Sequence, residues 1–444
     1  MMKRKFGLFI VLLILISVGL TWQEPLAAET TATTVSLNWS TPVQLSTGAT
    51  NGARIPSIAT MPDGSRTIVA FNRRMDGTSS NHDPYFVVST NVTVQESASP
   101  TWSAPAPIYT SNGVDSVQVD VALDAGAKAH AVWVEGTALR YADETQWPTG
   151  GTTISAPSLP PGAVAPKILA SGANTLDVVW AEPTSVSSPL PNIYHARSVD
   201  NGASWPSKNL LLNSAPTSDA PDIAIDSSGK LHVVWQENEV PDSVIKYVQG
   251  TPGAGNAVTW GTPVTISDVS NPRDAIEPHI LIVGDTIHVI YGDIDSSAPN
   301  PSTSDQYIHH IQCSSNCTNV NNWVSTNNPV SGVAVRANNN TPFDTSASMV
   351  KYGRCVSVYF HGTDISLNNN FNEILWGIDS CGWSVGAPRE QATSEQNRSL
   401  YPALAVANNW WLLMAYEQYD NANLPQIFFM RAALDVFLPT ITRN

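Results

Sequence analysis

Four cysteines are the residues of this chain whose side chains can form covalent bonds with one another or bind a metal. Disulfides are favoured here, because the start of the chain has the features of an export signal, described below. Cys355 begins one strand-like run and Cys381 ends the next, and a hairpin centred near Asn368 would place them opposite each other. We therefore predict a Cys355–Cys381 bond, with Cys313 and Cys317 closing a small loop.

Histidines and carboxylates are the other potential metal ligands. The histidines that recur at one site of a repeating strand are His130, His232 and His288. Their recurrence indicates repeat residues rather than ligands, and the pair His309 and His310 has no partner at ligand spacing. Calcium could bind among Asp293, Asp295 and Asp305, although no ordered ligand loop is present. We expect no required cofactor and leave calcium open.

The charge balance narrows the classes of partner. The chain has 22 Lys and Arg against 37 Asp and Glu. Removal of residues 1–28 would leave 19 basic and 36 acidic residues, a formal charge of −17. Such a surface repels nucleic acid and anionic lipid. The sequence also contains no Gly-rich phosphate loop, Ser-His-Asp signature or basic stripe.

Seven tryptophans mark a repeating pattern of strand-like segments, and these segments must position any functional site. The tryptophans are Trp39, Trp102, Trp147, Trp205, Trp260, Trp323 and Trp383, separated by 63, 45, 58, 55, 63 and 60 residues. Each follows a run of strand-like segments separated by turns rich in Asp, Gly, Ser and Asn. A repeat of this length and strand content predicts a β-propeller.

Each repeat opens with a short apolar strand that often contains proline. The openings are 55–58, 119–122, 165–168, 220–223, 277–280, 346–349 and 401–404. A second strand, apolar at nearly every position, indicates burial on both faces. We predict an all-β fold with seven four-stranded blades, or six blades plus an appended hairpin. Residues 39–45 have the form of a missing fourth strand, and we expect them to close the ring with the last repeat.

The N-terminus indicates export. A basic cluster, Lys3 to Lys5, precedes an apolar run from Phe6 to Leu20 and small residues at Ala27 and Ala28. We predict a signal peptide over 1–28, with an uncleaved anchor as the alternative, a propeller over 36–434 and a tail over 435–444. The expected product is a secreted or cell-surface monomer of bacterial type.

One turn carries a family resemblance. Residues 198–205, Ser-Val-Asp-Asn-Gly-Ala-Ser-Trp, resemble the Asp box of sialidase-like propellers, with Ser198, Asp200, Gly202 and Trp205 at its fixed positions. Asp200 can accept hydrogen bonds from turn amides, and Gly202 can adopt a left-handed backbone conformation. The box is a structural element, so it predicts fold and not chemistry. Other repeats keep remnants of it, such as Thr259 and Trp260.

A second motif implies candidate substrate contacts. Arg54-Ile55-Pro56 resembles the Arg-Ile-Pro motif that opens the sialidase propeller, where the arginine binds the substrate carboxylate. The resemblance implies that Arg74 lines the same pocket and that Asp76 donates a proton, with Asp83 as the second choice and a further substrate contact. The family's second triad arginine has no counterpart between Tyr291 and Asp293.

The resemblance also implies a nucleophile and its base. Tyr401 opens the first strand of the last repeat, as the family's nucleophilic tyrosine does, and Glu277 opens that of the fifth. A neutral phenol is a poor nucleophile, so a carboxylate would have to deprotonate it. First strands line the channel of a propeller, which would allow Arg54, Glu277 and Tyr401 to converge.

Two functions of different classes follow. The first is a sialidase-like retaining glycoside hydrolase acting on glycans. The second is a non-catalytic extracellular propeller that binds glycan or protein through its channel face. The fold alone does not choose between them, because propellers perform both functions.

Overall fold

The computed structural model describes part of one compact unit, Ser36–Asn444. It describes residues 39–433 apart from 76–80, 96–97, 112, 158–161, 186–187, 212–216, 240–241, 268–272, 295–305, 326–334, 337–346, 353–354, 365–372, 378–389, 392 and 394–398. Within these ranges no helix has the length and hydropathy needed to cross a membrane.

The first four strand repeats follow one another from β2 to β18. The first contains β2 (Ala53–Thr60), β3 (Thr67–Arg74), β4 (His82–Ser89) and β5 (Ala106–Pro107). The second contains β6 (Ser116–Leu123), β7 (Ala129–Glu135), β8 (Ala138–Asp143) and β9 (Thr152–Ser155). The third contains β10 (Val164–Gly172), β11 (Thr175–Ser185), β12 (Ser188–Ser198) and β13 (Lys208–Leu210). The fourth contains β14 (Thr217–Ile225), β15 (Leu231–Asn238), β16 (Val244–Pro252), β17 (Val258–Trp260) and β18 (Val264–Thr265).

The last three repeats include a short helix and the closing strand. The fifth contains β19 (Asp274–Val283), β20 (Thr286–Ile294), β21 (Gln306–Cys313), the 3-10 helix η2 (Val320–Asn322) and β22 (Val324–Ser325). After β23 (Val335–Arg336), the sixth contains β24 (Ala347–Tyr352), β25 (Cys355–Asp364), β26 (Glu373–Gly377) and β27 (Glu390–Gln391). The seventh contains β28 (Ser399–Ala407), β29 (Trp411–Tyr419), β30 (Pro425–Ala433) and β1 (Val43–Gln44).

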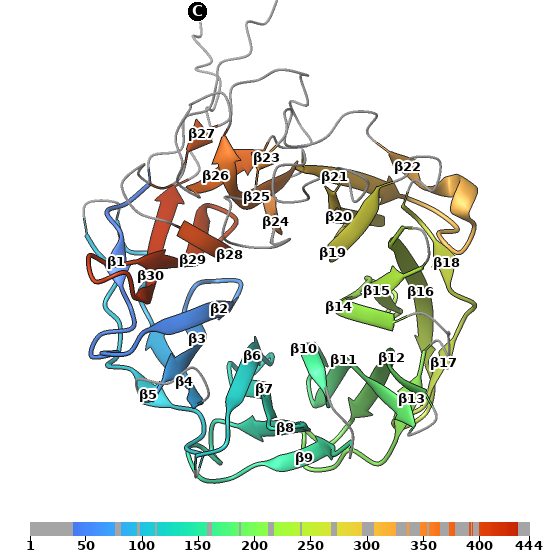
Figure 1. Ribbon diagram of the computed structural model, residues 1–444, viewed down its shortest axis with the longest axis horizontal. Coiled ribbons are helices and arrows are strands. Elements are labelled where there is room, and N and C mark those ends of the chain that lie inside the picture. Colours follow the sequence, from blue (N-terminus) through green and yellow to red (C-terminus); the bar gives the residue numbers. More distant parts are fainter. Residues whose placement is uncertain are drawn as a thin grey trace, which may run out of the picture. The chain divides into compact units, whose positions relative to one another are not determined.

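The described strands form a single β-propeller. All pairs are antiparallel, and the strands join into six continuous sheets. One sheet has nine strands because β23 pairs with both β21 and β25, which links the fifth and sixth repeats. The first strand of each repeat, β2, β6, β10, β14, β19, β24 or β28, lies nearest the centre (Figure 1). The predicted all-β propeller is therefore confirmed, with seven strand repeats in six sheets.

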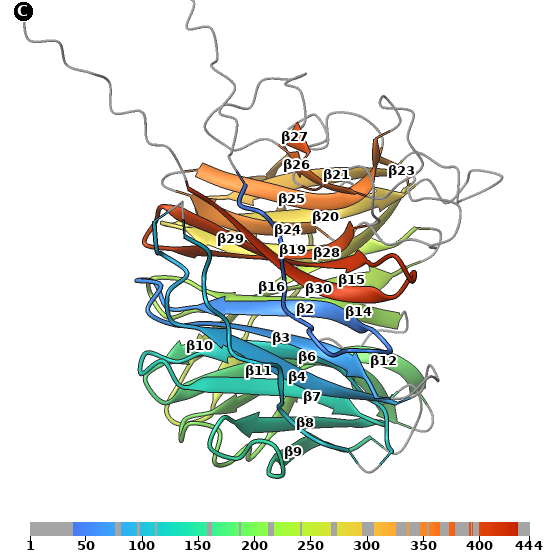
Figure 2. The same ribbon diagram turned by 90° about the vertical axis from the view of Figure 1, so that its left-hand side faces the viewer.

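The ring closes as the sequence predicts. β1 pairs with β30 through Val43 opposite Phe429, and Trp39 forms a bridge with Ala432. The last repeat thereby receives its fourth strand from the N-terminal side of the chain. Both views show the closing strands β28 to β30 beside β2 and β3 of the first repeat (Figures 1 and 2). Closure leaves no unpaired edge at β30, where aggregation would otherwise start.

The second strand of each repeat forms the core. β7 and β15 are buried along nearly their whole length, and Trp133, Trp180 and Trp235 at equivalent positions have no exposed surface. Burial on both faces explains why these segments are apolar at nearly every position.

The repeat tryptophans join neighbouring repeats. Each of the six described ones packs against a ring of the preceding repeat, with centroids 4.6 to 5.7 Å apart: Trp39 on Tyr359, Trp102 on Phe429, Trp147 on Phe86, Trp205 on Tyr141, Trp260 on His195, and Trp323 on Tyr247. Edge and tilted ring contacts of this kind stabilise beyond their buried area. The repeating tryptophan is therefore a contact between repeats. Trp383 lies outside the described residues.

The turn that resembles an Asp box has the predicted hydrogen bonds. Asp200 accepts from the Ser204 amide at 2.9 Å and from the Ser198 hydroxyl at 2.6 Å. These bonds hold the pKa of Asp200 down at about 2. Gly202 has φ +84°, and a Cβ there would lie 1.9 Å from the Tyr141 hydroxyl. The turn is therefore a structural element, and its geometry does not by itself show a family.

The cysteines lie in two different settings. Cys313 and Cys317 form the predicted disulfide, with Cα atoms 5.7 Å apart. The predicted hairpin between β25 and β26 is present, with Val358 opposite Gly377. The Cys355–Cys381 bond stays a prediction, because Cys381 and the Cys355 side chain lie outside the described residues.

The recurring histidines have structural partners within their repeats. His130 lies 2.8 Å from the Tyr141 hydroxyl and 3.3 Å from Asp124. His232 has the same arrangement, 2.7 Å from Tyr247 and 3.1 Å from Asp226. This equivalence confirms that both are repeat residues.

In the fifth repeat, His288 meets a histidine in place of the tyrosine. His288 Nδ1 lies 3.0 Å from His310 Nε2, and burial lowers the pKa of His288 to about 4 and that of His310 to about 3.

This histidine pair makes the stability of the fold depend on pH. Both pKa values are below the usual 6.5, so the stability contributed by the neutral pair is complete above pH 6.5 and is lost as pH falls towards 4. We expect a loss of about 3 kcal/mol between pH 7 and 4 from His288 alone. Thermal unfolding at several pH values should show a flatter profile for His288→Gln/His310→Gln than for the wild type, and parallel profiles would contradict this assignment.

Candidate active site

Six of the seven inner strands share one local distortion. Each has a register shift near its start and a non-glycine residue with φ between +48° and +56°: Ile55, Gln118, Ala165, Ala220, Glu277 and Tyr401. A bulge of this kind changes the direction of the side chains that follow it. The sequence-predicted residues Glu277 and Tyr401 therefore occupy the same position in two different repeats.

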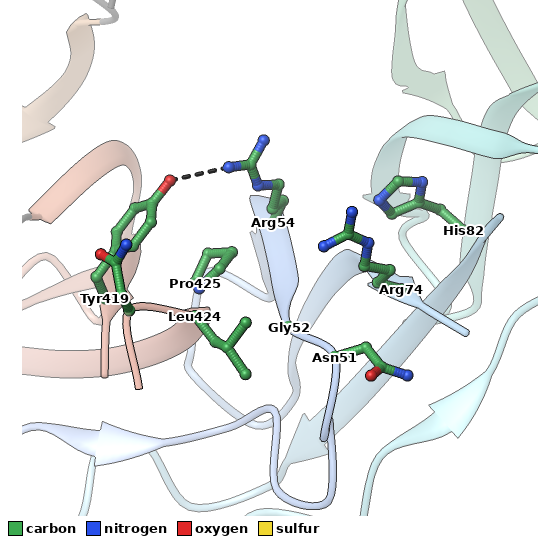
Figure 3. A pocket seen from close by; sticks show the side chains of 9 residues that line it. Asn51, Gly52, Arg54, Arg74, His82, Tyr419, Leu424 and Pro425 are labelled. Atoms are coloured by element: carbon green, nitrogen blue, oxygen red, sulfur yellow. Dashed lines mark hydrogen bonds between the residues drawn. The ribbon is translucent and has the colours of Figure 1, made fainter. Parts of the chain in front are cut away.

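An arginine pocket lies at the end of the first repeat. It has a volume of about 210 Å³ and is lined by Asn51, Gly52, Arg54, Arg74, His82, Tyr419, Asn423, Leu424 and Pro425. Arg54 comes from β2 and Arg74 from the end of β3, and their side chains lie next to each other (Figure 3). The two arginines predicted to share a pocket are thus brought together.

Arg54 is held by the last repeat. Its Nη2 donates to the Tyr419 hydroxyl at 2.8 Å, as Figure 3 shows, and the next residue, Ile55, donates its amide to buried Glu417 at 3.3 Å. Partial burial lowers the pKa of Arg54, but the Glu417 carboxylate and the hydrogen bond to Tyr419 raise it by more, so that the net shift is upward. The guanidinium is therefore fully charged and has a defined direction.

Arg74 and His82 complete the basic side of the pocket. They are register partners on β3 and β4, and the Arg74 amide donates to Gly52 O at 3.0 Å. His82 Nδ1 lies 2.9 Å from Asp115 Oδ1, which orients the ring. Two guanidinium groups in one small pocket suit a carboxylate, sulfate or phosphate, because each presents a planar fork of N–H donors.

The other predicted site residues are distributed differently. Tyr401 lines the central channel, and Glu277 lies on β19, with β24 between it and the Tyr401 strand in the order of the ring. The Glu277 amide hydrogen-bonds to Gln236 Oε1 at 3.3 Å. Asp83 is buried and accepts from the Ser111 amide at 3.0 Å and hydroxyl at 2.5 Å, so its carboxylate is used inside the fold. Asp76 lies outside the described residues.

The sequence did not point to two residues of this site: Tyr419, which lines the arginine pocket, and Glu417, which lies beside it. Tyr419 gave no signal, because the repeats have no common residue type at the position two residues after the glutamate of the second strand. Glu417 had one: Glu182 and Glu237 end the second strands of their repeats in the same way and are also buried. In those repeats the carboxylate accepts from tryptophan at 2.8 or 3.0 Å, whereas Glu417 accepts from the Ile55 amide and its charge raises the pKa of the neighbouring Arg54.

An arginine also lies near the segment where the sequence shows none. Arg273 pairs with Asp293, and its guanidinium carbon lies 5.2 Å from the Tyr307 ring centroid. His309 lies 2.8 Å from the same carboxylate. Asp293 is thus already paired with Arg273 and His309, while Asp295 and Asp305 fall outside the described residues. Among the residues that are described, no group of three or more His, Cys, Asp or Glu could hold a metal.

Comparison with known proteins identifies the fold. A protein of unknown function from Dyadobacter fermentans DSM 18053 aligns with a TM-score of 0.53 and 11% identity, covering 90% of this chain and 99% of that one. A Trypanosoma rangeli sialidase solved with 2,3-difluorosialic acid aligns with a TM-score of 0.45 and 12% identity, covering 86% and 54%. The GH93 α-L-arabinofuranosidase of Fusarium graminearum, solved with arabinobiose, gives 0.46 and 12%, covering 72% and 93%.

The first of these similarities shows the architecture alone. The two glycosidases share a small fraction of residues with this chain, and the alignment to them is too weak to transfer a reaction. No protein-family model matches the sequence, and no curated protein matches it either. The class that the fold and pocket define is a β-propeller with a basic pocket at the seam of its ring.

Proposed function

We propose that this protein is an exported propeller that binds an anionic glycan in the arginine pocket. The observation that supports this most directly is the presence of Arg54 and Arg74 in one pocket of about 210 Å³. The Tyr419 hydroxyl and the backbone of β2 fix Arg54, so little ordering is needed on binding. The ligand that fits best is a sugar carboxylate, which both guanidinium groups can reach at once.

The reaction that we propose for this pocket is retaining hydrolysis. Tyr401 loses its phenolic proton to Glu277 and attacks the anomeric carbon of the bound sugar, while Asp76 protonates the departing glycosidic oxygen. The product of this first half-reaction is a covalent glycoside of Tyr401. Water then attacks the same carbon and gives a proton to Asp76, while Glu277 returns its proton to the departing Tyr401 oxygen, so the free sugar is released and the three side chains regain their starting states. The overall change is addition of one water across one glycosidic bond.

A second function, glycan binding without chemistry, has its own supporting observation. Tyr401 and Glu277 stand at the bulge position that four other repeats fill with Ile55, Gln118, Ala165 and Ala220. The fold requires a residue there whatever the function. In a binder, these two residues would be channel lining, and the arginine pocket would keep its role.

Removing either pocket arginine tests the binding proposal. We expect Arg54→Ala and Arg74→Ala each to weaken binding of N-acetylneuraminic acid or glucuronic acid about tenfold or more, because a charge-assisted hydrogen bond contributes about 1.5–3 kcal/mol. Isothermal titration calorimetry measures the effect, which should shrink at high salt.

Arg73→Ala is the matched control, since Arg73 is adjacent on β3 but contacts the Gly48 carbonyl and the Tyr85 ring instead. Binding that survives both pocket variants, or that falls equally in the control, would rule out the arginine pocket as the anion site.

A further inference from the structure

His82 lies in the arginine pocket, and the proposed reaction gives it no role. It is the first residue of β4 and lines the pocket together with Arg54 and Arg74. Figure 3 shows Arg74 between the other two, with Tyr419 on the far side of Arg54. None of the nine residues that line the pocket is acidic. An anion bound at Arg74 would therefore lie beside the His82 ring and meet no carboxylate among these residues.

Asp115 fixes the direction of the His82 ring. Its Oδ1 atom accepts from the His82 amide at 2.9 Å and lies 2.9 Å from Nδ1 of the ring. An ionised carboxylate can only accept, so this contact places a proton on Nδ1. The Asp115 carbonyl accepts from the Gly136 amide at 2.9 Å, which ties Asp115 to the second repeat. The ring is thus held by the repeat that follows it, before any ligand arrives.

The second ring nitrogen of His82, Nε2, is left for the pocket. It makes no hydrogen bond to any residue in the described part of the chain, and 15% of the side-chain surface is exposed. With Nδ1 protonated, a neutral ring presents a lone pair at Nε2, whereas a charged ring presents an N–H donor there. The lone pair repels a carboxylate oxygen, and the N–H donor binds it. The affinity of the pocket for an anion should therefore depend on the charge of this one ring.

The charged groups around His82 act on its charge in opposite directions. Arg54 on β2 and Arg74 on β3 oppose a third positive charge, and the Asp115 carboxylate, directly before β6, favours it. An anion bound among these three side chains reduces the repulsion between them. Binding of the anion should therefore be accompanied by uptake of a proton.

The other titratable groups near His82 have partners of their own. Asp83, the next residue on β4, is buried and accepts from the Ser111 amide at 3.0 Å. The Tyr419 hydroxyl on β29 accepts from Arg54 at 2.8 Å. Of the four titratable side chains that line the pocket, only a histidine ordinarily changes its charge between pH 5 and 8. The charge of the pocket should therefore follow His82 in this range.

We propose that His82 is the third anion-binding residue of the arginine pocket, and that its Nε2 donates to the carboxylate of the acidic sugar, which binds together with a proton. This inference rests on the proposed function and adds its regulation. The charged ring predominates at low pH, so the pocket binds its ligand more tightly there and releases it as the pH rises. The carboxylate of the sugar stays ionised above pH 5 and does not reverse this direction.

Calorimetry with N-acetylneuraminic acid tests the role of His82. We expect the wild type to bind it about tenfold more weakly at pH 8 than at pH 5.5, the loss of one charge-assisted hydrogen bond. At pH 7, titrations in two buffers of different ionisation enthalpy should show that binding takes up protons. His82→Gln should bind equally at both pH values and take up no proton, because an amide does not titrate.

His279→Gln is the matched control. Its ring nitrogen Nδ1 also lies 3.0 Å from a carboxylate, that of Asp222, but the ring lines the central channel instead of the arginine pocket. This variant should keep the pH dependence of the wild type. Circular dichroism at both pH values checks that each variant is folded, and the proton uptake of the wild type gives a test that needs no variant.

The outcomes separate this inference from the proposed function. Equal affinity at both pH values and no proton uptake by the wild type would overturn the role of His82 and leave the arginine pocket intact. A pH dependence that survives in His82→Gln, or that disappears in His279→Gln, would also overturn it. If N-acetylneuraminic acid binds at neither pH, both proposals fail. If Arg54→Ala binds as the wild type does while His82→Gln loses the pH dependence, the role of His82 stands and that of the arginine fails.

Discussion

Replacing Tyr401 by phenylalanine is expected to lower kcat for an aryl sialoside at least a thousandfold. The variant loses one oxygen atom, and that atom is the proposed nucleophile. The phenyl ring still fills the bulge position on β28 and lines the channel, so folding and binding of N-acetylneuraminic acid should stay as they are. Release of the fluorogenic phenol measures the rate, and calorimetry measures binding. Unchanged turnover would remove Tyr401 from the reaction.

Tyr419→Phe is the matched control for this loss. It removes the hydroxyl that accepts from Arg54 at 2.8 Å, in the arginine pocket rather than the channel. We expect it to raise KM several-fold with a small change in kcat, because it loosens a binding group. If the wild type hydrolyses neither sialosides nor other aryl glycosides while it binds the acidic sugar, the protein is a binder and Tyr401 is channel lining.

The base that serves Tyr401 can be identified by two further variants. The resemblance assigns Glu277, which lies on β19, with β24 between its strand and β28. The structure offers a second carboxylate, Glu417, whose register partner on β28 is Leu400, the neighbour of Tyr401. If Glu277 is the base, Glu277→Gln should lose activity as Tyr401→Phe does and Glu417→Gln should mainly weaken binding through Arg54. The reverse pattern would transfer the role to Glu417.

The architecture was predictable because it repeats. Seven tryptophans at similar spacing indicate seven equivalent units, and a segment around Trp39 without its own repeat indicates ring closure. The partner of each tryptophan was not predictable, since it lies in the preceding repeat. Local sequence patterns predict the strands within one repeat. They do not show that Trp102 of the first repeat packs against Phe429 of the last, because these residues lie far apart in the sequence.

The site was predictable only in part for the same reason. Arg54 and Arg74 belong to one hairpin, and the spacing within a hairpin determines that they lie close together. Tyr419 and Glu417 reach Arg54 from the last repeat, so only closure of the ring reveals them. The channel residues Asp120, Lys167 and Asp222 follow strand openings that the sequence shows, but their convergence depends on a bulge in each strand that it does not show.

Closure also depends on a buried arginine in the last repeat. Arg431 on β30 is 1% exposed and lies with its guanidinium carbon 4.1 Å from the Trp411 ring centroid. It donates to main-chain carbonyls of the segment that follows β4 in the first repeat: Val92, Val94 at 2.8 Å, Gln95 at 3.0 Å and Ala98 at 2.6 Å. One side chain thus fixes a loop of the first repeat to the last.

Arg431→Met should therefore destabilise the ring at its seam. The variant keeps much of the apolar stem but leaves four carbonyls without their donor, and hydrogen bonds to a charged group contribute about 1.5–3 kcal/mol each before compensation by water. We expect a net loss of about 3 kcal/mol, seen as a fall of about 5 °C in Tm. Limited proteolysis should cut the segment between Val92 and Ala98 first, because that segment is released while β1 still pairs with β30.

Two controls separate this effect from simple loss of charge. Arg431→Lys keeps the charge with three donors on a narrower head group, so it should be intermediate. Arg140→Met removes a smaller set of contacts, an ion pair with Glu135 at 3.3 Å and a hydrogen bond to Thr153 at 2.6 Å in the same repeat and a ring contact with Tyr109, and should cost less than Arg431→Met. Equal melting temperatures for Arg431→Met and the wild type would show that strand pairing alone holds the ring closed. A large loss would mean that this one side chain, together with β1, keeps the first and last repeats in the register that places Tyr419 on Arg54.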